Sequence, residues 1–213
     1  MMNRKKLTAV VASVALVAVL GIGGTLMYFT DRDTKENVIT LGKVDGTLTE
    51  EGNGTETETG LKYDNVMPGD VLEKKPVVTV AHDSQDAYLR IKLDINGMYR
   101  DEEDLPQSVI DVIEAALDID KTVWEKGADN YYYYTGTTQG VVTADQAITF
   151  FTKVEIPAEN WTNDMAKASF NINLQAELIQ AANFADKLGY TDDTKTKINN
   201  WNIDAASIEA YNE

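Results

Sequence analysis

The chain of 213 residues is long enough for one domain with a substantial hydrophobic core. Its 35 acidic and 19 basic residues give a formal net charge of −16, which excludes nucleic acid and anionic membrane surfaces as expected partners. The chain has no cysteine and a single histidine, so disulfides are excluded and a transition-metal site is disfavoured.

The N-terminal segment has the pattern of a secretory signal. Basic residues at positions 4–6 precede an apolar run over residues 7–20. The apolar character continues to Phe29, long enough to span a bilayer, so a permanent anchor is the alternative. Glycines near the end of the run favour a cleaved signal, and we expect residues 1–28 to be the signal peptide. The protein would then contact the membrane only through the uncleaved signal.

Further along the chain, apolar and polar residues alternate with period two, which predicts half-buried strands. The clearest cases are residues 87–96, 147–156 and 168–178. In the first, Arg90 and Lys92 belong to the polar set that we expect to face solvent. Further strand candidates are residues 38–41, 44–49, 71–80 and 130–135. Such alternation favours antiparallel sheets that are packed on one side, hence a sandwich.

Three segments have helical patterns, namely residues 106–118, 182–188 and 205–211. Residues 49–60 are too polar to bury, and they predict a mobile surface hairpin or loop. We therefore expect one domain over residues 29–213, an all-β antiparallel sandwich with a few short decorating helices.

No common enzymatic motif is present. The sequence lacks HExxH, a nucleophile elbow, a Walker loop and GxGxxG, and His82 has the context of a solvated loop residue. The acidic clusters are best interpreted as solvated loops and leave open only a weak calcium site; they lie at residues 101–104, 118–120 and 192–193. We expect no catalytic residues and no cofactor.

The aromatic residues favour packing over ligand binding. The run of tyrosines at residues 131–134 should alternate along a strand, with two side chains in the core and two exposed. A carbohydrate-binding platform is the alternative. Trp124, Trp161 and Trp201 are predicted to be packing anchors.

The segment "GIGGTLMYFTDRDTKENVITLGKV" has no ordinary A-x-A cleavage site, and it resembles the export signal and mature start of the TasA/camelysin family of Gram-positive exported proteins. That family is processed by a dedicated signal peptidase of the SipW class. Gly23, Gly24, Thr25 and Phe29 match its junction, and Met27 departs from the usual small residue. The resemblance places the scissile bond next to Tyr28, within about two residues.

Later segments extend the resemblance in the expected order. Residues 66–95 are similar to the family's Pro-Gly-Asp element and the two strands after it, residues 131–157 to its hairpin, and residues 168–184 to its closing strand. In the element itself, Pro68 fixes φ, Gly69 can adopt the positive φ of a type II turn, and Asp70 leads into a strand.

The resemblance implies a jelly-roll-like sandwich that is exported to the extracellular matrix or cell surface of a Gram-positive bacterium. It also implies assembly into biofilm matrix fibres, in which the mature N-terminal segment of one copy inserts as a strand into the next. The matching donor segment is residues 29–41, and its apolar side chains are Phe29, Val38, Ile39 and Leu41. Pairing of residues 38–41 as an edge strand within their own domain is the alternative.

The leading hypothesis is therefore a structural fibre subunit whose partners are other copies of itself, an accessory matrix protein and the SipW-class signal peptidase. Two alternatives come from other classes. One is a secreted protease, as the resemblance to camelysin implies, and the other is a monomeric cell-surface binding module.

Overall fold

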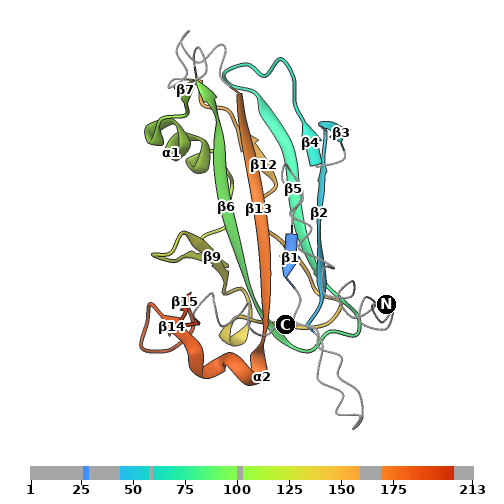
Figure 1. Cartoon of the computed structure of the whole chain (residues 1–213), viewed down its shortest axis with the longest axis vertical. Coiled ribbons are helices and arrows are strands. Elements are labelled where there is room, and N and C mark those ends of the chain that lie inside the picture. The colour runs from blue at the N-terminus through green and yellow to red at the C-terminus, as the bar shows by residue number, and fades with distance from the viewer. Residues whose placement is uncertain (1–25, 29–43, 58–59, 100–102, 159–168, 204–213) are drawn as a thin grey trace, which may run out of the picture.

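The computed structural model describes residues 26–28, 44–57, 60–99, 103–158 and 169–203. These residues form two packed β-sheets with a few short helices around them (Figure 1). The expected all-β sandwich is thereby confirmed. The predicted donor segment, the strand candidate 38–41, the helix 205–211, Trp161 and most of the predicted signal lie outside the described residues.

The larger sheet is built on two long antiparallel strands, β6 (Ala87–Tyr99) and β13 (Ser169–Gln180). They pair along the whole of β13, from Ser169 opposite Met98 to Gln180 opposite Ala87. The order across the sheet is β1-β13-β6-β9-β8, with β7 and β10 also paired to β6. The shorter strands are β1 (Leu26–Tyr28), β7 (Glu103–Asp104), β8 (Trp124–Lys126), β9 (Tyr131–Tyr134) and β10 (Val141–Val142).

The smaller sheet is centred on β5 (Val71–Val80), which has the bounds that the alternation predicts. β2 (Gly46–Gly52) pairs with one side of β5, and β11 (Ala147–Thr149) and β12 (Lys153–Glu155) pair with the other. The prediction of one strand over residues 147–156 is wrong. Phe150 and Phe151 are both buried, so the alternation breaks there. The Asp118 carboxylate holds the break by accepting hydrogen bonds from the Thr152 and Lys153 amides at 2.6 and 3.0 Å.

Short elements complete the fold. Two hairpins pair β3 (Thr55–Thr57) with β4 (Gly60–Lys62) and β14 (Leu188–Tyr190) with β15 (Ile198–Trp201). The helical elements are α1 (Gln107–Ala115), η1 (Thr138–Gly140), α2 (Ala181–Phe184) and η3 (Ala185–Lys187), so the helices predicted within 106–118 and 182–188 are found. No helix in the described ranges is long and apolar enough to cross a membrane.

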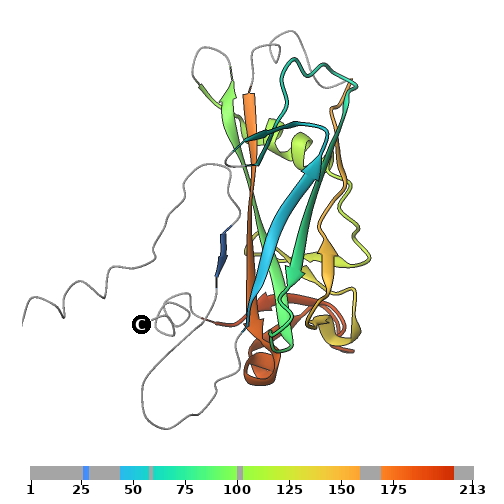
Figure 2. The same ribbon diagram turned by 90° about the vertical axis from the view of Figure 1, so that its right-hand side faces the viewer.

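The main core fills the space between the two sheets, which stand side by side in Figure 2. β6 contributes Leu89 and Ile91, and β5 contributes Val78 and Val80. Trp124 packs edge-on against Phe150 with ring centroids 5.0 Å apart, and its Nε1 donates to the Thr149 carbonyl at 3.1 Å. Trp124 and Trp201 are thus packing anchors, as the sequence predicts.

A second, smaller core lies on the outer face of the larger sheet, where the β14–β15 hairpin packs against Tyr88, Tyr133 and Ile179. This covering corrects two expectations. Arg90 is only 8% exposed, although its place in the strand pattern predicts a solvent-facing side chain. Tyr132 and Tyr133 are both buried, and Tyr131 and Tyr134 are half-buried, because β9 is covered on both faces.

Phe150→Ala tests the main core. Phe150 is fully buried among Trp124, Tyr132 and Phe151, so truncation should lower the free energy of unfolding by about 3–5 kcal/mol. Urea denaturation measures this change. Met67→Ala is the surface control, since Met67 is 64% exposed and its loss should cost no more than about 0.5 kcal/mol. Equal effects of the two variants would contradict the core assignment.

Asp192, in the turn of the β14–β15 hairpin, predicts a pH dependence. Its carboxylate accepts hydrogen bonds from the Thr196 amide and hydroxyl and from the Thr194 hydroxyl, which lowers its pKa to about 2 from an unfolded value of 3.8. A depressed folded pKa adds stability that is complete above the unfolded pKa and is lost as the pH falls through the folded one.

The stability difference between the native protein and Asp192→Asn should therefore shrink as the pH falls from about 5 to about 2. Urea unfolding midpoints at several pH values measure it, and Asp193→Asn, the exposed neighbour, controls for the loss of one acidic charge. A difference that stays constant over this range would contradict the prediction.

Candidate strand-binding edge

Among the described strands, one sheet edge is covered only in part. β13 has twelve residues, and β1 pairs with three of them, from Leu26 opposite Gln175 to Tyr28 opposite Glu177. On the same side of the sandwich, β2 pairs only with β5 among the described strands. Figures 1 and 2 show β1 beside β13, and β1 also contacts β2. The edges of the two sheets that other described strands leave free therefore lie on one side of the molecule.

Outside the three residues that pair with β1, no described strand pairs with this side of β13. An edge strand presents a row of N–H and C=O groups that can template pairing with another extended segment. β1 is short and runs parallel to β13, and parallel pairing is slightly less stable per residue than antiparallel pairing. The edge is therefore suited to binding an extended peptide segment by strand addition.

The outer face along β13 is polar. The Asn171 amide donates to Asn96 Oδ1 at 3.3 Å, and the Asn173 amide donates to Asp94 Oδ2 at 3.4 Å. The inner face carries Leu174, Ala176 and Leu178, which belong to the core. A strand added to the sheet next to β13 would thus lie beside polar side chains on its outer face and beside apolar side chains on its inner face.

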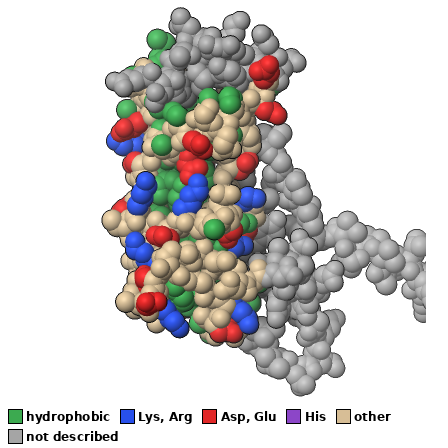
Figure 3. All heavy atoms as spheres, turned by 90° about the vertical axis from the view of Figure 1, so that its left-hand side faces the viewer, with side chains coloured by type: hydrophobic (Ala, Val, Ile, Leu, Met, Phe, Trp, Pro, Cys, Tyr) green, Lys and Arg blue, Asp and Glu red, His purple; other side chains and the backbone are tan. Residues whose placement is uncertain are grey.

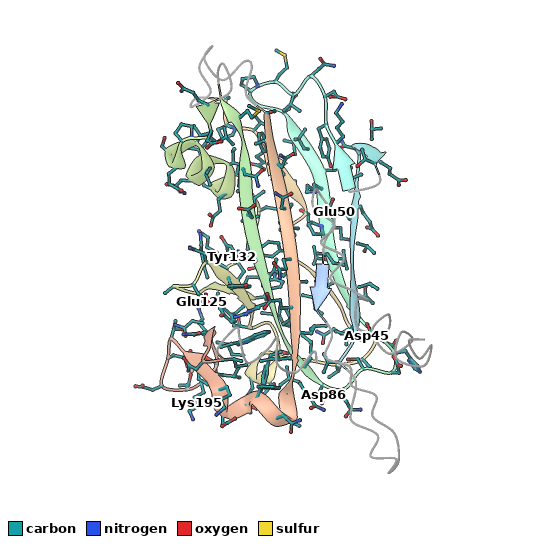
Figure 4. All side chains as sticks on the ribbon, viewed as in Figure 1. Asp45, Glu50, Asp86, Glu125, Tyr132 and Lys195 are labelled. Atoms are coloured by element: carbon teal, nitrogen blue, oxygen red, sulfur yellow. The ribbon has the colours of Figure 1, made fainter. Side chains whose placement is uncertain are left out.

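A buried ion pair lies at the level of the second free edge. Lys74 Nζ is 2.7 Å from Glu50 Oε2, with side chains 7% and 12% exposed. Figure 4 labels Glu50 on β2. Inward-pointing charges near an edge strand discourage unselective pairing. This pair was not predicted from the sequence, although Lys74 lies on the same face of β5 as the core residues Leu72, Val78 and Val80.

Arg90, on the outer face of the larger sheet, makes an ion pair, hydrogen bonds and two contacts with aromatic rings. Its Nη2 and Nε lie 2.6 and 2.7 Å from Glu177 Oε2, and its Nη1 donates to the Tyr133 hydroxyl at 3.3 Å. The guanidinium carbon stands 3.9 Å from the ring centroid of Tyr131 and 4.3 Å from that of Trp201. The cation is therefore held between two aromatic rings and paired with a carboxylate on β13.

The electrostatics follow from this burial. Although burial alone lowers the pKa of Arg90, the charge of Glu177 and the Tyr133 hydroxyl raise it above its ordinary value. Burial raises the pKa of Tyr131 to about 12, and the charge of Glu177 adds to that increase. At neutral pH, Arg90 therefore stays protonated and positively charged, and Tyr131 stays protonated and neutral. No local sequence pattern predicts this cluster, because the hairpin that covers it is distant in the chain.

Two ion pairs on the side of the molecule that carries β8 and α1 join different elements. Figure 3 shows acidic and basic side chains interspersed over this face. Lys126 pairs with Glu114 of α1, and Lys197 Nζ is 3.7 Å from Glu125 Oε2, which ties the hairpin loop to β8. Figure 4 places Glu125 and Tyr132 on this side, across the sheet from β1.

The predicted Pro68-Gly69-Asp70 element forms a turn. The Asp70 amide donates to the Met67 carbonyl at 3.0 Å, and Gly69 has a φ of +92°, as the third position of a type II turn requires. The Asp70 carboxylate accepts the Met67 amide at 2.7 Å. The Gly69 amide donates to the Ile156 carbonyl at 2.9 Å, which joins the turn to the chain just after β12.

The other predicted site residues divide into two groups. Met27 and Tyr28, from the predicted cleavage junction, lie on β1 at the β13 edge. The rest of the predicted junction and donor residues lie outside the described residues; these are Gly23, Gly24, Thr25, Phe29, Val38, Ile39 and Leu41. The structure thus brings part of the junction to the edge and leaves the donor segment as a prediction.

His82 has the solvated position that its sequence context predicts. Its side chain is 90% exposed, and its Nδ1 lies 2.7 Å from Asp145 Oδ2. A hydrogen bond to Asp145 and the charge of that residue raise the pKa of His82. The described part of the chain contains no group of three His, Cys, Asp or Glu side chains that could hold a metal ion.

Comparison with known proteins gives one match. The model of a family described as camelysin metallo-endopeptidase matches residues 2–130, which is more than half of the chain and includes β1, β2, β5 and β6. No curated protein and no solved structure matches. Its sequence resemblance, its sandwich fold and this match together show that the chain belongs to the camelysin family of extracellular proteins.

Proposed function

We propose that the protein is an exported structural subunit of extracellular matrix fibres, in which residues 29–41 of one copy add as a strand to the β13 edge of the next. The observation that carries this proposal is the edge itself, of which β1 covers three of twelve residues. The donor segment and β13 are about equal in length, and at ~3.3 Å per residue each spans roughly 40 Å.

The geometry of the contact favours a polymer. The donor segment and the acceptor edge are different surfaces of the same chain, so their contact is heterologous and can repeat from copy to copy. Backbone hydrogen bonds supply affinity that does not depend on sequence. The four apolar side chains of the donor segment, Phe29, Val38, Ile39 and Leu41, would add burial against the inner side of the edge.

Export and assembly would be coupled at this edge. β1 consists of residues 26–28, which fall within the predicted signal peptide. Cleavage next to Tyr28 by a SipW-class peptidase would remove the segment that pairs with β13 and would free residues 29–41 at the same time. The exported protein would then carry both an open edge and a free donor, alone or together with an accessory matrix protein.

Proteolysis is the second candidate, and the printed description of the family favours it. A metallo-endopeptidase needs a metal ion held by several side chains, commonly including histidines. The donor set of the described residues does not fit such a site, because it offers no group of three ligands and His82 is engaged with Asp145. Hydrolysis of casein by the purified protein with added zinc, abolished by a chelator, would favour this candidate.

A form that begins after Leu41 tests the role of the donor segment. Because all described core residues lie at Val44 or beyond, it should fold with the circular dichroism spectrum of the longer exported form. It should form no fibres by negative-stain electron microscopy, since it lacks a donor. Loss of the folded spectrum would instead assign residues 29–41 to the domain's own core. A folded, saturable ligand binder that never polymerises in either form would favour a monomeric surface module.

Cysteine crosslinking tests the position of the acceptor, and the absence of native cysteines makes it clean. Two single variants, Asn37→Cys in the donor segment and Asn173→Cys on β13, are mixed and treated with a short bis-maleimide. We expect crosslinked heterodimers, which can arise only between copies. Glu155→Cys, exposed on β12 at the other side of the sandwich, is the matched control and should give none. Equal yields with both acceptors would contradict the β13 assignment.

A further inference from the structure

A row of residues in register crosses the larger sheet from its free edge to its opposite side. Tyr28 of β1 lies opposite Glu177, Glu177 lies opposite Arg90, and Arg90 lies opposite Tyr133. Tyr133 in turn lies opposite Glu125 of β8. From Glu177 through Arg90 and Tyr133 to Glu125, residues opposite one another in adjacent strands place their side chains on the same face. The β13 residues that pair with the edge strand are therefore continuous with the outer face beneath the C-terminal hairpin.

The hairpin is fastened to this row. The ring of Trp201 covers the Arg90 guanidinium, and the Trp201 amide donates to the Tyr133 hydroxyl at 3.3 Å. At the other end of β15, Lys197 reaches Glu125. These contacts and the apolar contacts of Leu188 and Ile198 with Tyr88 and Tyr133 form what we call the hairpin clasp.

Glu177 belongs to both the edge and the clasp. Its carboxylate fixes Arg90 and accepts the Tyr131 hydroxyl at 3.1 Å and the Gln175 amide at 3.1 Å. Gln175 and Glu177 are the first and last residues of the three-residue segment that pairs with β1. The backbone that receives an added strand thus carries the side chains that orient the clasp.

We propose that Glu177 couples occupancy of the β13 edge to docking of the C-terminal hairpin, so that a strand bound at Gln175–Glu177 tightens the hairpin and a docked hairpin strengthens strand binding. The inference rests on the proposed function only in taking this edge as the strand-binding site. The bistable element is the hairpin, which is either docked on the outer face or released.

Two observations support a hairpin whose docking responds to occupancy of the β13 edge over one that is permanently docked. Its docking buries the Trp201 indole N–H, which finds no hydrogen-bond partner among the described residues. An unpaired buried donor opposes docking. The hairpin also depends on a buried charge pair whose anion sits on an edge strand, so loss of order at that edge loosens the partner of Arg90. By thermodynamic linkage the effect must operate in both directions.

Hydrogen–deuterium exchange of the full chain tests the proposal. Met27→Pro removes the β1 amide opposite Ala176 and fixes φ, so it should release β1 from the edge. We expect amides of β14 and β15, which do not pair with β1, to exchange at least about fivefold faster in this variant. Unchanged exchange in the hairpin, with faster exchange confirmed in β13, would overturn the proposal.

A double-mutant cycle assigns the effect to Glu177. In a Glu177→Gln background, Met27→Pro should no longer alter hairpin exchange, because the link is already broken. Asn171→Asp, on the same face of β13 but outside the segment paired with β1, is the matched control and should leave the response intact. A full response to Met27→Pro in the Glu177→Gln background would overturn the assignment.

If Glu177→Gln does not fold, Tyr131→Phe provides a milder probe. It removes one hydrogen bond to Glu177 and keeps the ring over Arg90, so the response should be reduced but present. The experiment uses single subunits and does not depend on fibres. Coupling without fibres would leave this inference intact and count against the proposed function, whereas fibres without coupling would do the reverse.

Discussion

The structure depends on the pairing of β13 with β6. These two long strands form the spine of the larger sheet, and their inner faces supply much of the core against the smaller sheet. On its other side, the only described strand that pairs with β13 is the short β1. Within the described part of the chain, β13 is therefore both the centre of the sheet and a partly covered edge. In a monomeric protein a long edge is an aggregation hazard, and here it is the feature that suits the molecule to strand addition.

The polar groups near the free edges limit which segments can bind there. The Glu50–Lys74 pair faces inward from the smaller sheet, and amide side chains line the outer face of β13. Neither surface offers a purely apolar strip that would pair with any exposed strand. The acidic charge of the whole chain adds long-range repulsion between copies, so the proposed assembly would need specific contacts to overcome it.

The local pattern of the sequence was sufficient to predict the architecture. Period-two alternation located β5, β6 and β13, because each strand has one face on the core, and the Pro-Gly pair located the turn at Gly69. The alternation did not predict which side chains are buried where both faces of a strand are covered. Arg90 and Tyr133 were expected to follow simple alternation, but the C-terminal hairpin covers the outer face at their level. No local sequence pattern predicts such a contact between segments that are distant in the chain.

The candidate site was predicted in part. The resemblance to the family's export signal predicted a cleavage junction around Met27 and Tyr28, and the structure places these two residues on the β13 edge. The role of Glu177 could not have been predicted, since it depends on which strands lie opposite one another. In the sequence, Glu177 is one of four alternating polar residues of a strand, and its neighbours Asn171, Asn173 and Gln175 look equivalent to it. Glu177 differs from these neighbours because the register of the sheet places it opposite Arg90.

The most direct test of the account is a cryo-electron microscopy map of filaments formed by the purified exported protein. We predict an added strand along β13, continuous with the N-terminus of the neighbouring subunit and covering the edge well beyond Gln175–Glu177. Filaments in which β13 is bare, or is paired only with a segment of its own chain, would contradict the claim that this edge joins one subunit to the next.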